Sequence, residues 1–136
     1  MLIDVLARSV RSGGSRPFLT YYDLDTGERT EFSLTSFANW VDKTANLLDT
    51  LDVAGEAVLG ALSLTHPGHW VSLIWPLATW QSGGSWQLPG VADHEAALRV
   101  QGPQDPGPVL TDATVVCSLH PLGLPSRDLP DGTIDY

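Results

Sequence analysis

The feature that most constrains the fold is a stripe of mostly apolar residues at helical spacing, followed by a short apolar run. Six residues recur at alternating steps of three and four: Leu34, Phe37, Val41, Thr44, Leu48 and Leu51. This spacing predicts an amphipathic helix over 34–51, with Ser33 as its N-cap and Phe32 beside it as a hydrophobic flank. The run 57–64 is too short and too apolar for a surface helix, so it predicts a buried strand of the parallel type.

A second apolar helix and a second strand follow. The residues expected on the buried face of a helix over 69–81 are Trp70, Leu73, Ile74, Leu77 and Trp80. Pro67 stands where such a helix begins, and Pro76 should bend it. Gly83 and Gly84 end it before a strand at 85–88. A strand, a crossover helix and a strand form a βαβ unit, so we predict an α/β fold of three layers with a mostly parallel sheet and flanking helices.

The two ends of the chain show weaker patterns. A helix over 1–11 and a hairpin of segments 17–23 and 28–32, turning at Gly27, are expected at the N-terminus. Beyond residue 90 we expect a helix at 93–100, a loop at 102–108, strands at 109–111 and 115–119, and a turn-rich segment at 121–131. Ile134, Asp135 and Tyr136 look like the start of an element that continues. The length of 136 residues predicts one domain, of which 91–136 is the less defined part.

Charge and composition exclude several classes of partner. Sixteen acidic side chains outnumber seven basic ones, giving a net charge of −9 that disfavours nucleic acid and anionic membranes. No stretch approaches the ~18–20 apolar residues that span a bilayer. Asp4 interrupts the N-terminal apolar residues, so we expect no signal peptide and a cytoplasmic location. One Lys against six Arg suggests a bacterial source.

Few residues suggest chemistry. Cys117 is the only cysteine, which excludes an intrachain disulfide and a Cys-type metal site and favours a buried thiol. His66 and His69 bracket two residues and, with His120, form the candidate polar site. We favour structural roles for His66, near the start of a helix, and for His69, a partly exposed first-turn residue, because no further His stands near enough to complete a metal site. His120 closes a strand, where it can face a cleft. A dyad of Cys117 and His120 is disfavoured, because strand residues three apart point to opposite faces.

Two further chemical alternatives are weak. Asp23, Asp25 and Gly27 have the spacing of a calcium loop but lack the bidentate Glu, so we expect a turn. Ser, His and Asp residues are present, but no Gly-x-Ser-x-Gly nucleophile elbow supports a hydrolase. We therefore predict no catalytic residue and no metal.

Five tryptophans are the remaining unusual feature. They lie in or near the two main helices and the strand after them: Trp40, Trp70, Trp75, Trp80 and Trp86. Packing explains most of them, and an exposed Trp more often marks an interface than a ligand cage. Our candidate interface is Trp70, Trp75 and Trp80, on a helix with apolar residues on both sides. A homodimer is the expected use of that face, unless the segment 121–136 folds back to cover it.

The order of these elements resembles the opening of the AMP-forming acyl- and aryl-CoA ligases, the ANL superfamily. The resemblance covers about the first ninety residues and lies in Arg16-Pro17-Phe18-Leu19-Thr20-Tyr21-Tyr22, Phe32-Ser33-Leu34 and Ala57-Val58-Leu59-Gly60-Ala61-Leu62. Ser36 departs from it, because the family has an acidic residue there. Ser118-Leu119-His120-Pro121-Leu122-Gly123 is similar to a segment of short bacterial proteins that match only this front portion.

The resemblance implies the fold of the ligases' N-terminal subdomain but not their activity. Those ligases hold triphosphate in a loop rich in Ser, Thr and Gly that is followed by Lys. Here Ser82-Gly83-Gly84-Ser85 has no Lys after it, and the sole lysine, Lys43, lies far upstream. The family's ribose-binding Asp and C-terminal catalytic Lys have no counterpart. We therefore expect a module without cofactor that binds a partner protein or a second copy; the alternative is the front fragment of a true ligase.

Overall fold

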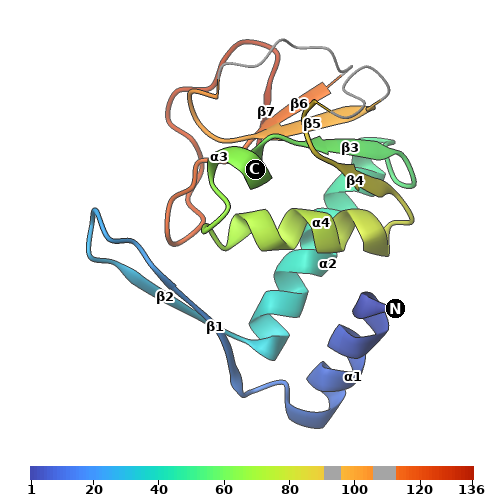
Figure 1. The fold of residues 1–136 in the computed structure, drawn as a ribbon, viewed down its shortest axis with the longest axis vertical. Helices are drawn as coiled ribbons and strands as arrows, with labels where there is room; N and C mark the ends of the chain where they lie inside the picture. Colours follow the sequence, from blue (N-terminus) through green and yellow to red (C-terminus); the bar gives the residue numbers. More distant parts are fainter. Residues whose placement is uncertain (91–95, 106–112) are drawn as a thin grey trace.

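A five-stranded parallel sheet forms the centre of the molecule. A computed structural model describes residues 1–90, 96–105 and 113–136 (Figure 1). The strands lie in the order β4-β3-β5-β6-β7, and every neighbouring pair is parallel. Their bounds are β3 Ala57–Gly60, β4 Ser85–Gln87, β5 Leu98–Gln101, β6 Ala113–Val116 and β7 Ile134–Asp135. The predicted α/β fold with a parallel sheet and flanking helices is confirmed.

Two helices cover one face of this sheet. Helices α2 (Leu34–Thr50) and α4 (Val71–Gln81) share one core cluster with the sheet residues Val58, Leu98 and Val100. Helix α1 (Leu2–Gly13) lies on the far side of α2 and α4 from the sheet (Figure 1). The helices therefore form an inner and an outer layer.

Helix α2 follows the predicted stripe. Phe37, Val41, Thr44 and Leu48 are buried, as the spacing of three and four requires. The Ser33 hydroxyl oxygen accepts the backbone N–H of Ser36 at 3.1 Å, which confirms the N-cap.

The hairpin is also confirmed, and it projects away from the body of the molecule (Figure 1). Strand β1 (Pro17–Tyr22) pairs with β2 (Arg29–Ser33) in an antiparallel, two-stranded sheet. In the turn, a carboxylate oxygen of Asp23 accepts the backbone N–H groups of Asp25 and Thr26 at 2.9 and 3.1 Å. Gly27 has a φ of 73°, which glycine adopts at little cost. The sequence Asp23–Gly27 is thus a turn rather than a calcium loop.

Two predicted elements were wrong in type. The apolar run 57–64 is a strand only to Gly60, and Leu62–Thr65 form the short helix α3, because periodicity cannot tell a buried strand from a buried helix. The helix expected at 93–100 is replaced by β5 over its last residues, while 93–95 lie outside the described residues. Leu98-Arg99-Val100-Gln101 alternates apolar and polar side chains, which is the strand period.

The C-terminal part differs in detail from the prediction. The strand expected at 115–119 is β6, which ends at Val116, and the strand expected at 109–111 falls outside the described residues. Of the loop expected at 102–108, the structure describes residues 102–105 only. Ile134 and Asp135 form the sheet strand β7, which pairs in parallel with β6.

The buried face of α4 was predicted wrongly in part. Leu73 and Trp80 are 45% and 42% exposed, whereas Trp75 on the opposite side is fully buried. Apolar residues surround this helix, so tertiary packing rather than periodicity decides which side faces inward. The ring of Tyr136 packs against Trp75 with 4.9 Å between centroids, and the C-terminus therefore covers that side.

Candidate interaction site

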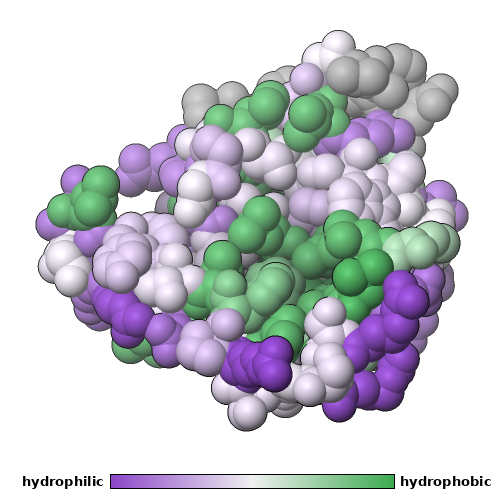
Figure 2. Space-filling model, turned by 60° about the horizontal axis from the view of Figure 1, so that its bottom comes forward, coloured by the Kyte–Doolittle hydropathy of each residue, from purple (hydrophilic) through white to green (hydrophobic). Residues whose placement is uncertain are grey.

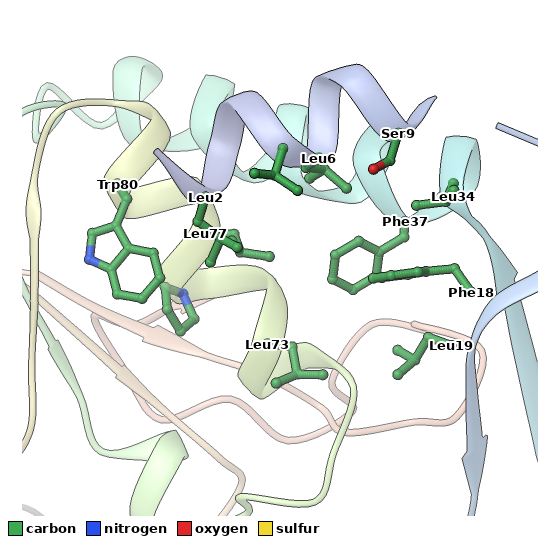
Figure 3. Close-up of a pocket in the computed structure, with 12 residues that line it drawn as sticks. Leu2, Leu6, Ser9, Phe18, Leu19, Leu34, Phe37, Leu73, Leu77 and Trp80 are labelled. Carbon is green, nitrogen blue, oxygen red and sulfur yellow. The ribbon is translucent and has the colours of Figure 1, made fainter. Parts of the chain in front are cut away.

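An apolar groove lies between the outer helix and α4. It has a volume of about 430 Å³ (Figure 3). Helices α1, α2 and α4 and strand β1 line it with Leu2, Val5, Leu6, Ser9, Phe18, Leu19, Leu34, Phe37, Leu73, Pro76, Leu77 and Trp80. Figure 2 shows apolar surface gathered on this side of the molecule and bordered by hydrophilic residues. An exposed apolar patch with a polar rim is the usual mark of an interaction site.

The first wall of the groove is the amphipathic helix α1. None of its residues is fully buried, and Leu2 and Val5 are 57% and 48% exposed. Backbone hydrogen bonds fix the end of the helix: Thr35 N–H donates to Gly14 O at 2.9 Å, and Leu34 N–H donates to Arg16 O at 3.1 Å. A side chain at Gly14 would come within 2.3 Å of the Thr35 hydroxyl, so only glycine allows this close approach. The connection therefore holds α1 in place while Leu2 and Val5 on its apolar face stay exposed.

The second wall is the exposed side of α4. Of the three tryptophans proposed as an interface, Trp70 and Trp75 are 2% and 0% exposed and belong to the core, while Trp80 lies in the groove. The C-terminal segment explains this division, because Gly123 lies against the rings of Trp40 and Trp70. The alternative that 121–136 folds back onto the molecule thus holds for the Trp75 side of α4 and not for the Trp80 side.

The N-terminal segment that contains α1 and β1 differs in charge from the rest of the chain. Arg8, Arg11 and Arg16 lie within the first 22 residues, where Asp4 is the only acidic residue. The Arg16 side chain lies against Gly13, within 3.0 Å of where a Cβ would stand, and so covers the end of α1. A chain of net charge −9 thus carries a net basic N-terminal segment, and this segment includes α1, the first wall of the groove.

His69, one of the three candidate histidines, has a structural role. It was expected to be partly exposed but is only 6% exposed. Its Nδ1 accepts the Val71 N–H at 3.2 Å, so Nε2 carries the proton and donates to Leu119 O at 3.0 Å. Burial lowers the pKa of His69 below its usual value of 6.5, and the nearby His66 lowers it further, against the opposing effects of Leu119 O and Asp23. Both ring nitrogens are engaged, so His69 and His66 do not share a metal.

His66 and His120 also have local partners. The Nδ1 of His66 lies 2.9 Å from the Thr65 hydroxyl. His120 lines a second cleft of about 480 Å³, together with Gln101 and Val116 at the ends of β5 and β6. Its Nδ1 accepts the Leu122 N–H, and the neighbouring Ser118 hydroxyl donates to Leu124 O. These bonds stabilise the turn rather than pairing a nucleophile with a base.

Cys117 is a core residue. It is fully buried, and burial raises the pKa of its thiol to about 12. A thiol of that pKa is not ionised near neutral pH and is therefore a poor nucleophile. Among the residues that the structure describes, no group of three His, Cys, Asp or Glu side chains is placed to hold a metal. No helix in the described ranges is long and apolar enough to cross a membrane.

The loop Ser82–Ser85 ends α4, as expected. Ser82 N–H donates to Ala78 O, Gly83 N–H to Trp80 O, and Gly84 N–H to Thr79 O. Gly83 has a φ of 86°, and the Ser85 N–H bonds to Glu56 O. Phosphate cradles need free backbone N–H groups, and these four are already used.

The groove was not predicted from the sequence. Its α1 and β1 residues, such as Leu2, Val5 and Phe18, were assigned to elements but not to a site. The available signal was the apolar face of α1, for which the sequence offered no covering element.

Comparisons with known proteins place this fold. No family model matches the chain. It is 34% identical over 137 residues to the TIGR03089 family protein of Mycobacterium tuberculosis, and the match covers 97% of this chain. The chain spans about half, 56%, of the length of that relative.

Three solved structures share the fold at low identity. CmiS6 has a TM-score of 0.61 at 19% identity, covering 98% of this chain and 36% of that one. The acyl-CoA synthetase of Brucella canis has a TM-score of 0.66 at 17% identity, covering 97% and 26%. A benzoate CoA ligase from Burkholderia xenovorans LB400 has a TM-score of 0.57 at 15% identity, covering 89% and 26%.

These matches define the class of fold. Nearly the whole chain adopts the architecture of about a quarter of an acyl-CoA synthetase and of a benzoate CoA ligase, and of about a third of CmiS6. The predicted resemblance to the AMP-forming ligases is therefore confirmed at the level of the fold.

Proposed function

We propose that this chain is a non-catalytic interaction module that acts through the groove between α1 and α4. Its occupant is a second copy of the chain or a partner protein. The observation that carries this proposal is the open, almost wholly apolar groove, with five of its lining side chains more than 40% exposed: Leu2, Val5, Phe18, Leu73 and Trp80. Small-molecule sites combine apolar walls with a few placed polar groups, and of the described side chains lining this groove Ser9 alone carries a hydroxyl. Such a surface suits the apolar face of a protein.

A fluorescent apolar probe tests the groove directly. Anilinonaphthalene sulfonate should bind to dilute protein at one saturable site. Leu73→Asp places a charge in the groove and should weaken binding about tenfold. Leu64→Asp is the matched control, because Leu64 is 54% exposed in α3 and outside the groove. Equal binding by both variants, with cooperative unfolding retained, would contradict the groove as a binding surface.

Two observations support the non-catalytic part. The N–H groups of Ser82, Gly83 and Gly84 bond to carbonyls of α4, and that of Ser85 bonds to Glu56 O. The lone lysine, Lys43, lies in α2. Pyrophosphate exchange with ATP, magnesium and a panel of carboxylates should therefore stay at background. Reproducible carboxylate-dependent exchange, lost in a preparation from cells without the gene, would overturn this part.

The second candidate function is the front part of an adenylating ligase. It is favoured by the solved structures, which match nearly all of this chain with 26–36% of their own length. The coding sequence after Tyr136 separates the candidates. A Ser/Thr/Gly-rich loop followed by Lys there would favour the ligase, and its lack would favour the module.

A further inference from the structure

The hairpin presents an apolar side chain at its tip. Leu24 is 92% exposed, the highest value among the described large apolar side chains. It stands between Asp23 and Asp25, and the hairpin carries it away from the body of the molecule (Figure 1). An exposed apolar residue between carboxylates, on a projecting arm, has the form of a docking element.

The turn holds this tip in one conformation. Asp23 accepts two backbone N–H groups with its carboxylate, and its own N–H donates to Glu28 O at 2.8 Å. Gly27 N–H donates to Asp23 O at 2.8 Å, and Glu28 N–H donates to the Thr26 hydroxyl at 3.3 Å. Because the tip is already ordered, docking it costs less conformational entropy than ordering a flexible loop would.

The tip and the groove have complementary charge. The tip carries Asp23, Asp25 and Glu28 with no basic residue among positions 23–28. Arg16 packs over the end of α1, the helix that forms the first wall of the groove, and Arg8 and Arg11 belong to the same helix. Elsewhere the chain is strongly acidic, so an acidic tip is attracted to the α1 side and repelled by the other surfaces.

We propose that the hairpin tip of a second copy docks in this groove, with Leu24 among the apolar side chains and its flanking carboxylates toward Arg16. The inference rests on the proposed function of the groove. A chain cannot fill its own groove in this way, because β1 begins at the groove with Phe18 and leads away from it. Its six residues span about 20 Å, enough to reach a neighbouring copy. Reciprocal exchange of two hairpins closes a two-fold dimer.

Light scattering coupled to size exclusion over the micromolar range tests this dimer. The wild-type chain should give twice the 14.6 kDa of one chain. Leu24→Asp should raise the dissociation constant about thirtyfold or more, because a central apolar anchor is lost. Leu64→Asp should leave the dimer intact. Leu24 is exposed, so its replacement does not disturb the core.

Charge reversal identifies the two surfaces. Arg16→Glu and Asp25→Arg should each weaken the dimer about tenfold, and the double variant should recover most of the loss. A monomeric wild type overturns the proposal, and so does a double variant weaker than either single one. If Leu73→Asp abolishes the dimer and Leu24→Asp does not, the proposal is also overturned: the groove is then the interface, but the hairpin is not what occupies it. A groove that fails to bind the apolar probe instead contradicts the proposed function itself.

Discussion

The hydroxyl groups of Tyr136 and Thr44 lie 2.7 Å apart, although the residues are 92 positions apart in sequence. Thr44 donates its own proton to Trp40 O at 2.8 Å, so the Tyr136 hydroxyl is the donor of the shared bond. Burial raises the pKa of Tyr136 above its usual value of 10.0. The last residue of the chain is thus bonded to the main helix, which closes the Trp75 side of α4 and leaves the groove open on the other side.

Tyr136→Phe tests this anchor. The substitution keeps the ring on Trp75 and removes one hydrogen bond, so the free energy of unfolding should fall by about 1 kcal/mol. Urea denaturation followed by tryptophan fluorescence measures it. Tyr22→Phe, at a residue 61% exposed, is the control and should change stability by less than about 0.5 kcal/mol. Equal effects of the two would show that the bond contributes nothing.

Leu48→Ala tests the stripe of α2. Leu48 is fully buried in the core cluster, so its truncation leaves a cavity and should cost about 2–5 kcal/mol. Asn46→Ala, on the exposed face of the same helix, is the control. A denaturant midpoint for Leu48→Ala equal to that of the control would contradict the assignment of the buried face.

The fold was largely predictable because local patterns determine it. The stripe from Leu34 to Leu51 and the glycines after α4 fix their elements without tertiary information. The errors occurred where two structures share one pattern. Leu62 continues an apolar run that is compatible with either a buried helix or a buried strand. Leu98 begins a strand of only four residues, which was predicted to be part of a helix. Short elements carry too few periods to be told apart.

The site was predictable only in part, because it depends on what remains uncovered. The sequence indicated that α4 is apolar on both sides, and Trp80 proved to lie in the groove. It could not show that Tyr136 would cover Trp75, since that contact joins residues far apart in the chain. The role of Leu24 also depends on a shape, the projecting hairpin, that local periodicity does not describe.

His69 should titrate below pH 6.5. Its lowered pKa means that the folded state disfavours the charged form, so the unfolded state binds more protons below pH 6.5. The stability contributed by neutral His69 is complete above pH 6.5 and is lost as the pH falls toward the folded-state pKa. The imidazole signals in a proton NMR titration give this pKa, and His69→Gln identifies the resonance. A midpoint at or above 6.5 would contradict the burial of this ring and the hydrogen bond that its Nδ1 accepts from the Val71 N–H.

Gly60 and Trp86 should be coupled in stability. A Cβ at Gly60 would lie 2.0 Å from Cζ2 of the Trp86 indole, which covers β3 at this point, so Gly60→Ala should cost about 1–3 kcal/mol through overpacking. Trp86→Ala is destabilising by itself but removes the indole that an alanine at position 60 would meet. The double variant should therefore lose less free energy of unfolding than the two single variants combined. Gly68→Ala is the control, because a Cβ there meets nothing within 4 Å. Strict additivity in urea denaturation would mean that the indole does not pack over Gly60 in solution.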